Sequence, residues 1–337
     1  MPNKRILIIT VKGYEPPESL DGLAEEEIHP IKTDFDVATG LKQLGHKVRV
    51  LGLADDITQL HHAIDDFKPH VVFNLLEHFN QRVALMPYVL GYLELAGIPY
   101  TGCNPIGMVF SNDKARQRKI LRHHRIPCPA FFTVAKGQQP RRPKRLDFPL
   151  IVKSLTEHGS AGIAEASVVH TDEKLAERAA HVHETVGTDA IVEQFIKGRE
   201  IYCSVLGNKR LATFPLWELS FENLRDDAPV IVTERLKWNV RRQKAAGIDI
   251  RKANLETALQ NRITHACKRA YRALEQNGYA RFDLRLTDDG RFYIIESNPN
   301  PQLAFDEEFA ESAAAAGIPY HDLLTRIINL ALRSAKR

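Results

Sequence analysis

Three oxygen-bearing side chains stand close together on two short segments in the last sixth of the chain. Asp283 lies in the alternating segment ARFDLRL, and Glu296 and Asn298 end the apolar segment FYIIESNPNP. Side chains two positions apart on a strand share a face, so Glu296 and Asn298 point the same way. Carboxylates and an amide oxygen are hard ligands of the kind that Mg²⁺ binds. The pattern predicts a magnesium site, although a surface network of ion pairs explains these segments alone equally well.

The linking sequence TDDGR predicts a β-hairpin, because Asp-Gly is the strongest short signal for a tight turn. If the turn consists of residues 289–290, counting outward places Asp283 opposite Glu296 and Arg281 opposite Asn298. Facing carboxylates repel, since their Cβ atoms lie roughly 5 Å apart. An arginine, a proton or a divalent cation must therefore compensate.

Lysines and small residues elsewhere are compatible with a phosphate site. The segment LIVKSLTEHGSAGI is a strand that ends at Lys153 and runs into a loop of small residues, whose N–H groups could bind an anion. Lys114 opens the basic helix of SNDKARQRK, and TERLKWNVRR contributes Lys237. Glycine-serine loops and solvated lysines are also common, so none of these signals is specific alone.

The segment VEQFIKGRE could contact a nucleoside. It places Glu193 and Glu200 around Gly198, between two strands that we expect to pair, DAIVEQFI and EIYCSVLG. Backbone groups there could face a base, and Glu200 could accept hydrogen bonds from ribose hydroxyls. A solvated hairpin explains the same residues.

The elements that carry these residues begin with alternating strands and helices. The strands RILIITV, HKVRVLGL and HVVFNLL alternate with helices expected over residues 36–44 and 58–67. This order predicts a parallel sheet covered on both faces. Only Gly13 follows the first strand, so a dinucleotide fingerprint is absent. Three domains are predicted, over residues 1–103, 104–193 and 194–337.

Composition excludes several classes of protein. The 337 residues carry a net charge of +4, and the one short basic run, RRPKR, fits a loop better than a nucleic-acid surface. The apolar stretch VALMPYVLGYLELAG is interrupted by Pro87, Gly91 and Glu94, so it is no membrane span. Four cysteines without a CxxC pair are typical of reduced thiols. We expect a cytoplasmic protein without a nucleic-acid or membrane partner.

Taken together and in order, these segments resemble the ATP-grasp ligases, most closely the D-alanine–D-alanine ligase family. The resemblance runs through FNLLEH, IPYTGCNPIGMVFSNDK, FPLIVKSLTEHGSAGI, IVEQFIKGREIYCSVLGN and ARFDLRLTDDGRFYIIESNPNP. It implies an α/β fold in which an N-terminal open parallel-sheet domain precedes two ATP-grasp domains that enclose the nucleotide. It also implies a carboxylate and an amine as small-molecule substrates, joined through an acyl phosphate, and a possible homodimer.

The resemblance implies roles for individual residues. The positions that match ATP-binding residues are Lys114, Lys153, His158, Gly159, Ser160, Ala161, Glu193, Gln194, Ile196, Glu200 and Lys237. The positions that match metal ligands, for two Mg²⁺ ions that Mn²⁺ could replace, are Asp283, Glu296 and Asn298. The positions with catalytic roles are Arg281, Lys237 and Ser160, with Arg281 stabilising the tetrahedral intermediate.

Departures from the family pattern concern the substrates. Where the family has a Pro-Gly-Met-Thr/Ser type of segment that holds the acceptor's carboxylate, this chain reads PNPQLAFD, with Gln302 a candidate replacement. The family's Ser-Ala-Glu segment after the first strand becomes a longer insertion, in which Glu15 or Glu18 could stand in, and Trp238 occupies a usual tyrosine position. We therefore expect other amino acids or similar substrates in place of two D-alanines.

Three alternatives remain at this point. The chain could be an authentic D-alanine–D-alanine ligase of cell-wall synthesis, or an ATP-binding regulatory module without catalysis. Retention of Arg281 beside a full set of metal ligands argues against the regulatory module, because binding ATP does not require that arginine. A metal-dependent hydrolase would use the Asp283 and Glu296 pair but leaves Lys114 and Lys153 unexplained.

Overall fold

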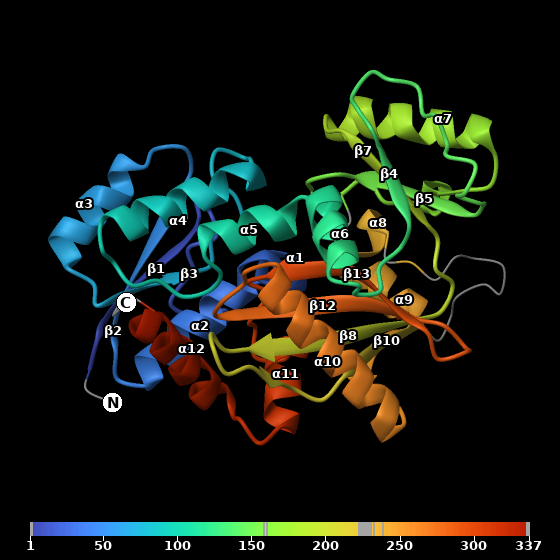
Figure 1. Ribbon diagram of the computed structural model, residues 1–337. Coiled ribbons are helices and arrows are strands. Elements are labelled where there is room, and N and C mark those ends of the chain that lie inside the picture. Colours follow the sequence, from blue (N-terminus) through green and yellow to red (C-terminus); the bar gives the residue numbers. More distant parts are fainter. Residues whose placement is uncertain are drawn as a thin grey trace.

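The strands that the structure describes form three separate sheets (Figure 1). The computed structural model describes residues 3–157, 159, 161–221, 231, 233–237 and 239–334, without the side chains of Lys237 and Val240. Among the described helices, none is both long and apolar enough to cross a membrane.

The first sheet is parallel, as predicted, in the order β2-β1-β3. Its elements are β1 (Arg5–Val11), α1 (Glu25–Ile28), η1 (His29–Ile31), α2 (Lys32–Gln43), β2 (Lys47–Leu53), α3 (Thr58–Phe67), β3 (Val71–Asn74), η2 (Val83–Leu85), α4 (Met86–Leu95) and α5 (Pro105–Asn112). Alternate residues of β1 face opposite layers. Ile6 and Ile8 pack with α2, and Leu7 and Ile9 pack with α3 and α4.

The C-terminal helix α12 (Tyr320–Ser334) also covers the first sheet. Its apolar residues Leu324 and Ile327 share one core with Ile8 and Phe73. Figure 1 shows the helix next to this sheet. The end of the chain therefore contributes to the N-terminal core. The predicted domain ranges stay predictions.

The second sheet is antiparallel, in the order β4-β7-β5-β6. Its elements are α6 (Lys114–His123), β4 (Phe131–Val134), β5 (Leu150–Ser154), η3 (Glu165–Ser167), β6 (Val168–Val169), α7 (Asp172–His181), the π-helical turn η4 (Val182–Val186) and β7 (Ala190–Gln194). Leu175 and Ala179 of α7 pack on Val152 and Val192, so this helix covers one face of the sheet.

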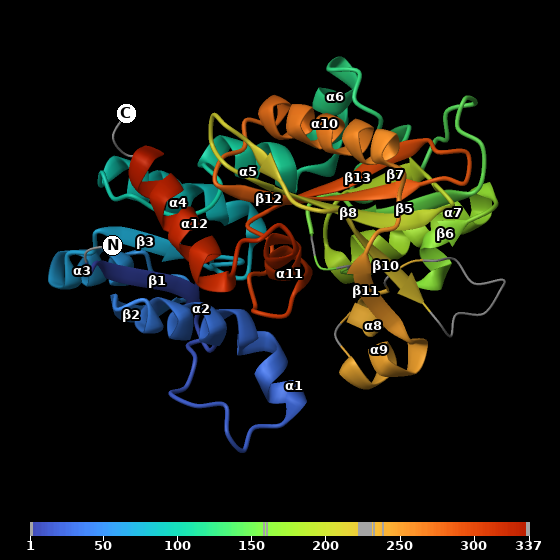
Figure 2. The same cartoon turned by 90° about the horizontal axis from the view of Figure 1, so that it is seen from below.

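The third sheet has six strands, in the order β11-β10-β8-β12-β13 with β9 beside β8. Its elements are β8 (Arg199–Leu206), β9 (Ala212–Thr213), β10 (Trp217–Phe221), α8 (Glu234–Lys237), α9 (Val240–Ala246), β11 (Ile248–Lys252), α10 (Thr257–Ala273), β12 (Tyr279–Leu286), β13 (Phe292–Pro299) and α11 (Glu308–Ala315). Figure 2 shows α10 and α6 on one side of this sheet and α8 and α9 on the other.

The predicted pairing of the strands around Gly198 is wrong. β7 pairs with β4 and β5, whereas β8 pairs with β10 and β12, so residues 195–198 connect two different sheets. Gly198 has φ 155° and its Cα lies against the Leu286 carbonyl oxygen, where a Cβ would collide. Two strand-like segments separated by a short glycine linker resemble a hairpin in sequence, and only the packing distinguishes the two arrangements.

Candidate functional site

The hairpin of β12 and β13 pairs the predicted metal ligands as expected. Asp283 faces Glu296 and Arg281 faces Asn298, so all four side chains lie on one face. Strand alternation predicted which of these side chains share a face, and counting outward from the turn predicted which residues lie opposite each other.

The predicted two-residue turn of this hairpin is wrong. The N–H of Thr287 donates to the carbonyl of Arg291, 2.8 Å away, so the loop has three residues and Asp288 does not pair with Arg291. Gly290 takes φ 76°, as a three-residue loop requires. The register near the loop is therefore shifted by one residue, and a bulge after Asp283 restores it. The predicted register at Asp283 and Glu296 is nevertheless correct, because the error in loop length and the bulge that was not predicted cancel each other.

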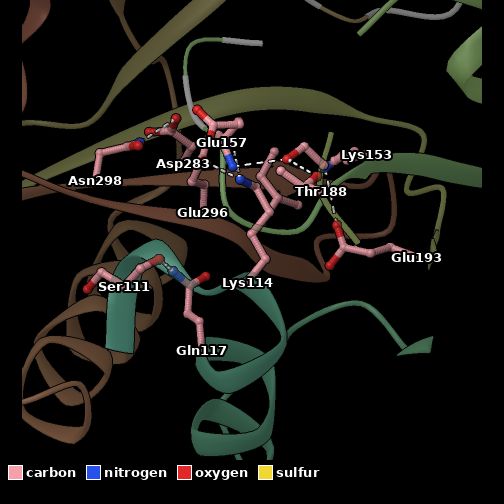
Figure 3. A network of polar contacts seen from close by, with 12 residues as sticks. Ser111, Lys114, Gln117, Lys153, Glu157, Thr188, Glu193, Asp283, Glu296 and Asn298 are labelled. Carbon is pink, nitrogen blue, oxygen red and sulfur yellow. Dashed lines mark hydrogen bonds and ion pairs between the residues drawn. The ribbon is translucent and has the colours of Figure 1, made fainter. Parts of the chain in front are cut away.

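One of the predicted metal ligands, Asp283, is paired with the guanidinium of Arg281. Arg281 Nε lies 2.7 Å from Asp283 Oδ1, and the Asn298 amide donates to Asp283 Oδ2 at 2.9 Å (Figure 3). Burial raises the pKa of Asp283 above its ordinary value, and Glu296 raises it further, although Arg281 opposes both effects.

Two carboxylates and one amide oxygen form a donor set that suits Mg²⁺. Asp283 is buried beside Glu296, and a divalent cation would relieve their repulsion. Asn298 would have to rotate its amide to present oxygen, because its nitrogen now faces Asp283. Within the described ranges, no three His, Cys, Asp or Glu side chains form a metal cluster, so Asn298 is needed to complete this set.

The predicted phosphate lysines converge on this hairpin from the second sheet and from α6. Lys114 Nζ donates to the carbonyl of Glu157 at 2.6 Å and lies 3.4 Å from Glu296 Oε1 (Figure 3). Burial lowers the pKa of Lys114, and the nearby Lys153 lowers it further, whereas Glu296 opposes the shift. Two ammonium groups this close favour a polyanionic ligand between them.

Glu193, predicted to contact adenine, is buried between two cations. Its carboxylate lies 2.7 Å from Arg118 Nε and 3.2 Å from Lys153 Nζ. Burial opposes its charge most strongly, yet Arg118 and Lys153 hold the pKa of Glu193 below its ordinary value. In the structure, Glu193 holds the ammonium group of Lys153 in place. A contact between Glu193 and the adenine of ATP stays a prediction.

Arg118 is a site residue that the sequence reasoning missed. It is fully buried and also donates to the carbonyl of Ile295, next to Glu296. It follows Lys114 by one helical turn on α6, so the two share a face. That spacing was the available signal.

The remaining predicted nucleotide residues surround the connection between the sheets. Ile196 is buried and Gln194 exposed, and Glu200 binds Arg285 Nη2 at 2.7 Å and accepts from the Tyr202 hydroxyl at 3.0 Å. Glu200 therefore has a fixed position, because Arg285 contacts one oxygen of its carboxylate and Tyr202 donates to the other.

The small-residue loop after β5 lies against α8. Gly162 N–H donates to Glu234 Oε2 at 2.9 Å, and Gly159, which precedes Ala161 in this loop, lines the same cavity as Lys153. Three predicted positions, His158, Ser160 and Trp238, lie outside the described residues, as does the side chain of Lys237. Their roles stay predictions.

Glu308 is a second residue that the sequence reasoning missed. It begins α11, is buried, and forms an ion pair with Arg281 Nη1. Burial opposes the charge of Arg281, but Asp283 raises the pKa of this guanidinium above its ordinary value, so it stays charged. The guanidinium also stacks over the ring of Tyr202, 4.7 Å from its centroid.

One cavity of about 260 Å³ joins these groups. The site residues that line it are Lys153, Gly159, Glu200, Arg281, Asp283, Glu296, Asn298 and Gln302. Oxygen donors for a cation, a lysine for phosphate and an arginine beside both therefore face one enclosed space.

Comparison with known proteins shows which family the chain belongs to. The family described as "D-ala D-ala ligase C-terminus" matches residues 120–329. The D-alanine–D-alanine ligase of Desulfotalea psychrophila is 31% identical over 251 residues, 74% of this chain and 74% of that protein. The chain belongs to the D-alanine–D-alanine ligase family. The uncharacterised protein y4sG of Sinorhizobium fredii is also 31% identical, over 263 residues, 78% of this chain and 75% of that protein.

Solved structures agree with this membership. The D-alanine–D-alanine ligase of Bacillus anthracis, solved in complex with ATP, superposes with a TM-score of 0.77 at 25% identity, over 99% of each chain. The VanG D-Ala:D-Ser ligase of Enterococcus faecalis shares the fold, with a TM-score of 0.72 at 19% identity over 98% of this chain and 99% of that one. The protein is thus an α/β ATP-grasp enzyme, an ATP-dependent carbon–nitrogen ligase that acts on small molecules.

Proposed function

We propose that this ligase converts a carboxylate into an acyl phosphate with ATP and then joins it to an amine. The observation that carries the proposal is the single cavity in which Lys153, Asp283, Glu296 and Arg281 meet. A carboxylate is a poor electrophile, so phosphorylation must precede attack by an amine.

Residues of this chain would bind and orient the reactants. Lys114 and Lys153 would bind the phosphates of ATP, and Glu200 would accept hydrogen bonds from the ribose. Asp283, Glu296 and Asn298 would hold Mg²⁺, which when bound supplies positive charge beside the transferred phosphoryl group. Arg281 would stabilise the oxyanion that forms when the amine attacks the acyl carbon.

The experiment is a release assay for ADP across pairs of carboxylates and amines, with D-alanine alone among them. We expect one pair to exceed D-alanine clearly, because PNPQLAFD replaces the family's acceptor-binding segment. The variant K153A should lower turnover with every pair. Absence of ADP release with all pairs, together with intact ATP binding, would favour a regulatory module instead.

A second candidate is authentic D-alanine–D-alanine ligation, which the names of the relatives favour. The same assay separates the two. D-Alanyl-D-alanine formation at rates that no other pair matches would establish the second candidate and contradict our reading of the departures.

A further inference from the structure

The substrate end of the cavity lies beyond Arg281. Besides the nucleotide and metal residues, the cavity is lined by His29, Gln243, Gln302 and Glu307. Glu307 precedes Glu308, the ion-pair partner of Arg281, and both glutamates line the cavity. This end is built from η1, α9 and the segment that links β13 to α11.

The other charged groups that line the cavity are already neutralised by partners. The pairs are Glu200 with Arg285, Asp283 and Glu308 with Arg281, Glu296 with Lys114, and Lys153 with Glu193. Glu307 differs from them. Among the residues that the structure describes, no side chain donates a hydrogen bond or forms an ion pair to its half-buried carboxylate.

Two basic residues of α9, which helps to build this end of the cavity, form ion pairs with α1. Lys244 of α9 lies 2.8 Å from Glu25 of α1, and Arg241 lies 3.3 Å from Glu26. Figure 2 shows α1 and α9 on the same side of the molecule. These four side chains are exposed, and Lys244 and Arg241 do not line the cavity, so among the described residues neither of these two cations is available to a substrate carboxylate at Glu307.

We infer that the amine substrate carries a second, positively charged group, which Glu307 binds while Gln302 accepts a hydrogen bond from it. This inference rests on the proposed function and names the class of its amine. An amine whose second group is a carboxylate would place that group next to the carboxylate of Glu307. Repulsion between the two negative charges would weaken its binding.

The reaction balances with such a substrate. One amine, in its neutral form, attacks the acyl carbon and forms the C–N bond, and phosphate leaves with the electron pair of the broken C–O bond. The proton of the attacking nitrogen passes to solvent, and the second amine stays protonated against Glu307.

Three amines of matched length test the inference by calorimetric titration of the full chain, saturated with Mg²⁺ and a non-hydrolysable ATP analogue. They are diaminopropane, propylamine and β-alanine, whose far ends are cationic, neutral and anionic. We expect diaminopropane to bind about tenfold more tightly than propylamine, as one charge-assisted hydrogen bond allows, and β-alanine to bind most weakly.

Variants connect the preference to the carboxylate. E307Q should remove the advantage of diaminopropane, and E307K should favour β-alanine. The control E311Q removes the same charge one helical turn further along, inside α11 and at a position that does not line the cavity, and it should change nothing.

Three results would overturn the inference: β-alanine binding at least as tightly as diaminopropane, no binding of any of the amines, or equal effects of E307Q and E311Q. Each of these leaves the proposed function intact if the ATP analogue binds. Failure of the analogue itself to bind would overturn the proposed function and this inference together.

Discussion

Lys153 and Glu193 form a buried ion pair, with Nζ and Oε2 3.2 Å apart, and Arg118 binds the other oxygen of the same carboxylate at 2.7 Å. The pair connects β5 to β7, and Arg118 connects both to α6. One acid thus fixes a predicted phosphate lysine and neutralises a fully buried arginine.

The variant E193Q should destabilise the protein by about 3–5 kcal/mol, because it leaves Arg118 buried without its counter-charge. Urea unfolding at pH 7 measures this loss. The exposed pair of Lys174 and Glu177 supplies the control, E177Q, which should change the free energy of unfolding little.

The loss in E193Q should also depend on pH. The pKa of Glu193 is lowered on folding, so its stabilising charge is fully present above the ordinary glutamate value of 4.5 and disappears as the pH falls below it. The difference between wild type and variant should shrink in that range. A difference that stays constant down to pH 3 would contradict the buried pair.

The variant E296Q should raise the magnesium concentration needed for half-maximal binding of an ATP analogue by roughly tenfold or more. Even residues that only hydrogen-bond to metal ligands often contribute 10–100-fold to metal affinity. A magnesium titration at fixed analogue concentration measures the effect. E218Q, which removes a carboxylate paired with Arg199 on the same sheet, is the control. Equal magnesium curves for E296Q and wild type would argue against a metal at this hairpin.

Asp34 should make stability fall as the pH rises from 4 to 8. Burial, with smaller contributions from Glu77 and Glu15, raises the pKa of Asp34 from 3.8 to about 7. Between these two pKa values, Asp34 has lost its proton in the unfolded chain and keeps it in the folded chain. Ionising Asp34 in the folded protein therefore costs on the order of 4 kcal/mol.

The variant D34N should therefore flatten this pH profile and be more stable than wild type at pH 8. Unfolding midpoints in urea between pH 4 and 8 report it. D36N, on the same helix α2, removes the carboxylate that pairs with Lys32 and should leave the slope in place. A wild-type profile that rises over this interval would show that Asp34 is ionised in the folded protein.

The ion pairs between α1 and α9 should help to close the substrate end. The double variant E25K/E26K places lysines against Lys244 and Arg241, so we expect a higher KM for the amine with kcat largely retained. High salt should reduce the difference from wild type, because exposed charges are screened. E27K is the matched control, since Glu27 bonds to the Ala24 N–H and not to α9. An equal rise in KM for E27K would show that the effect comes from any charge reversal in α1 and not from the ion pairs with α9.

Patterns within one segment predicted the parts of the site that a single element or hairpin determines. Alternation in β12 and β13 placed Glu296 and Asn298 on one face, and the helix expected near residues 58–67 is α3, Thr58–Phe67. Local patterns failed for the turn, because an Asp-Gly pair fits both a two-residue and a three-residue loop, and they did not predict the bulge after Asp283.

Contacts between distant segments were beyond local reasoning. Arg118 meets Glu193 across 75 positions, and Arg281 meets Glu308 across 27 positions that include the whole of β13. Such pairs depend on how the sheets pack, which hydrophobic periodicity does not encode. The packing of α12 on the first sheet has the same origin.

The transfer of oxygen from the carboxylate substrate to phosphate tests the central claim most directly. The carboxylate of the most active pair is labelled with oxygen-18, and the inorganic phosphate released is analysed by mass spectrometry. Activation through an acyl phosphate predicts one labelled oxygen in each phosphate, because the P–O bond formed in the first step is kept when the amine attacks carbon. Phosphate without label, released at the same rate as ADP, would show that water attacks ATP and would contradict the ligase mechanism.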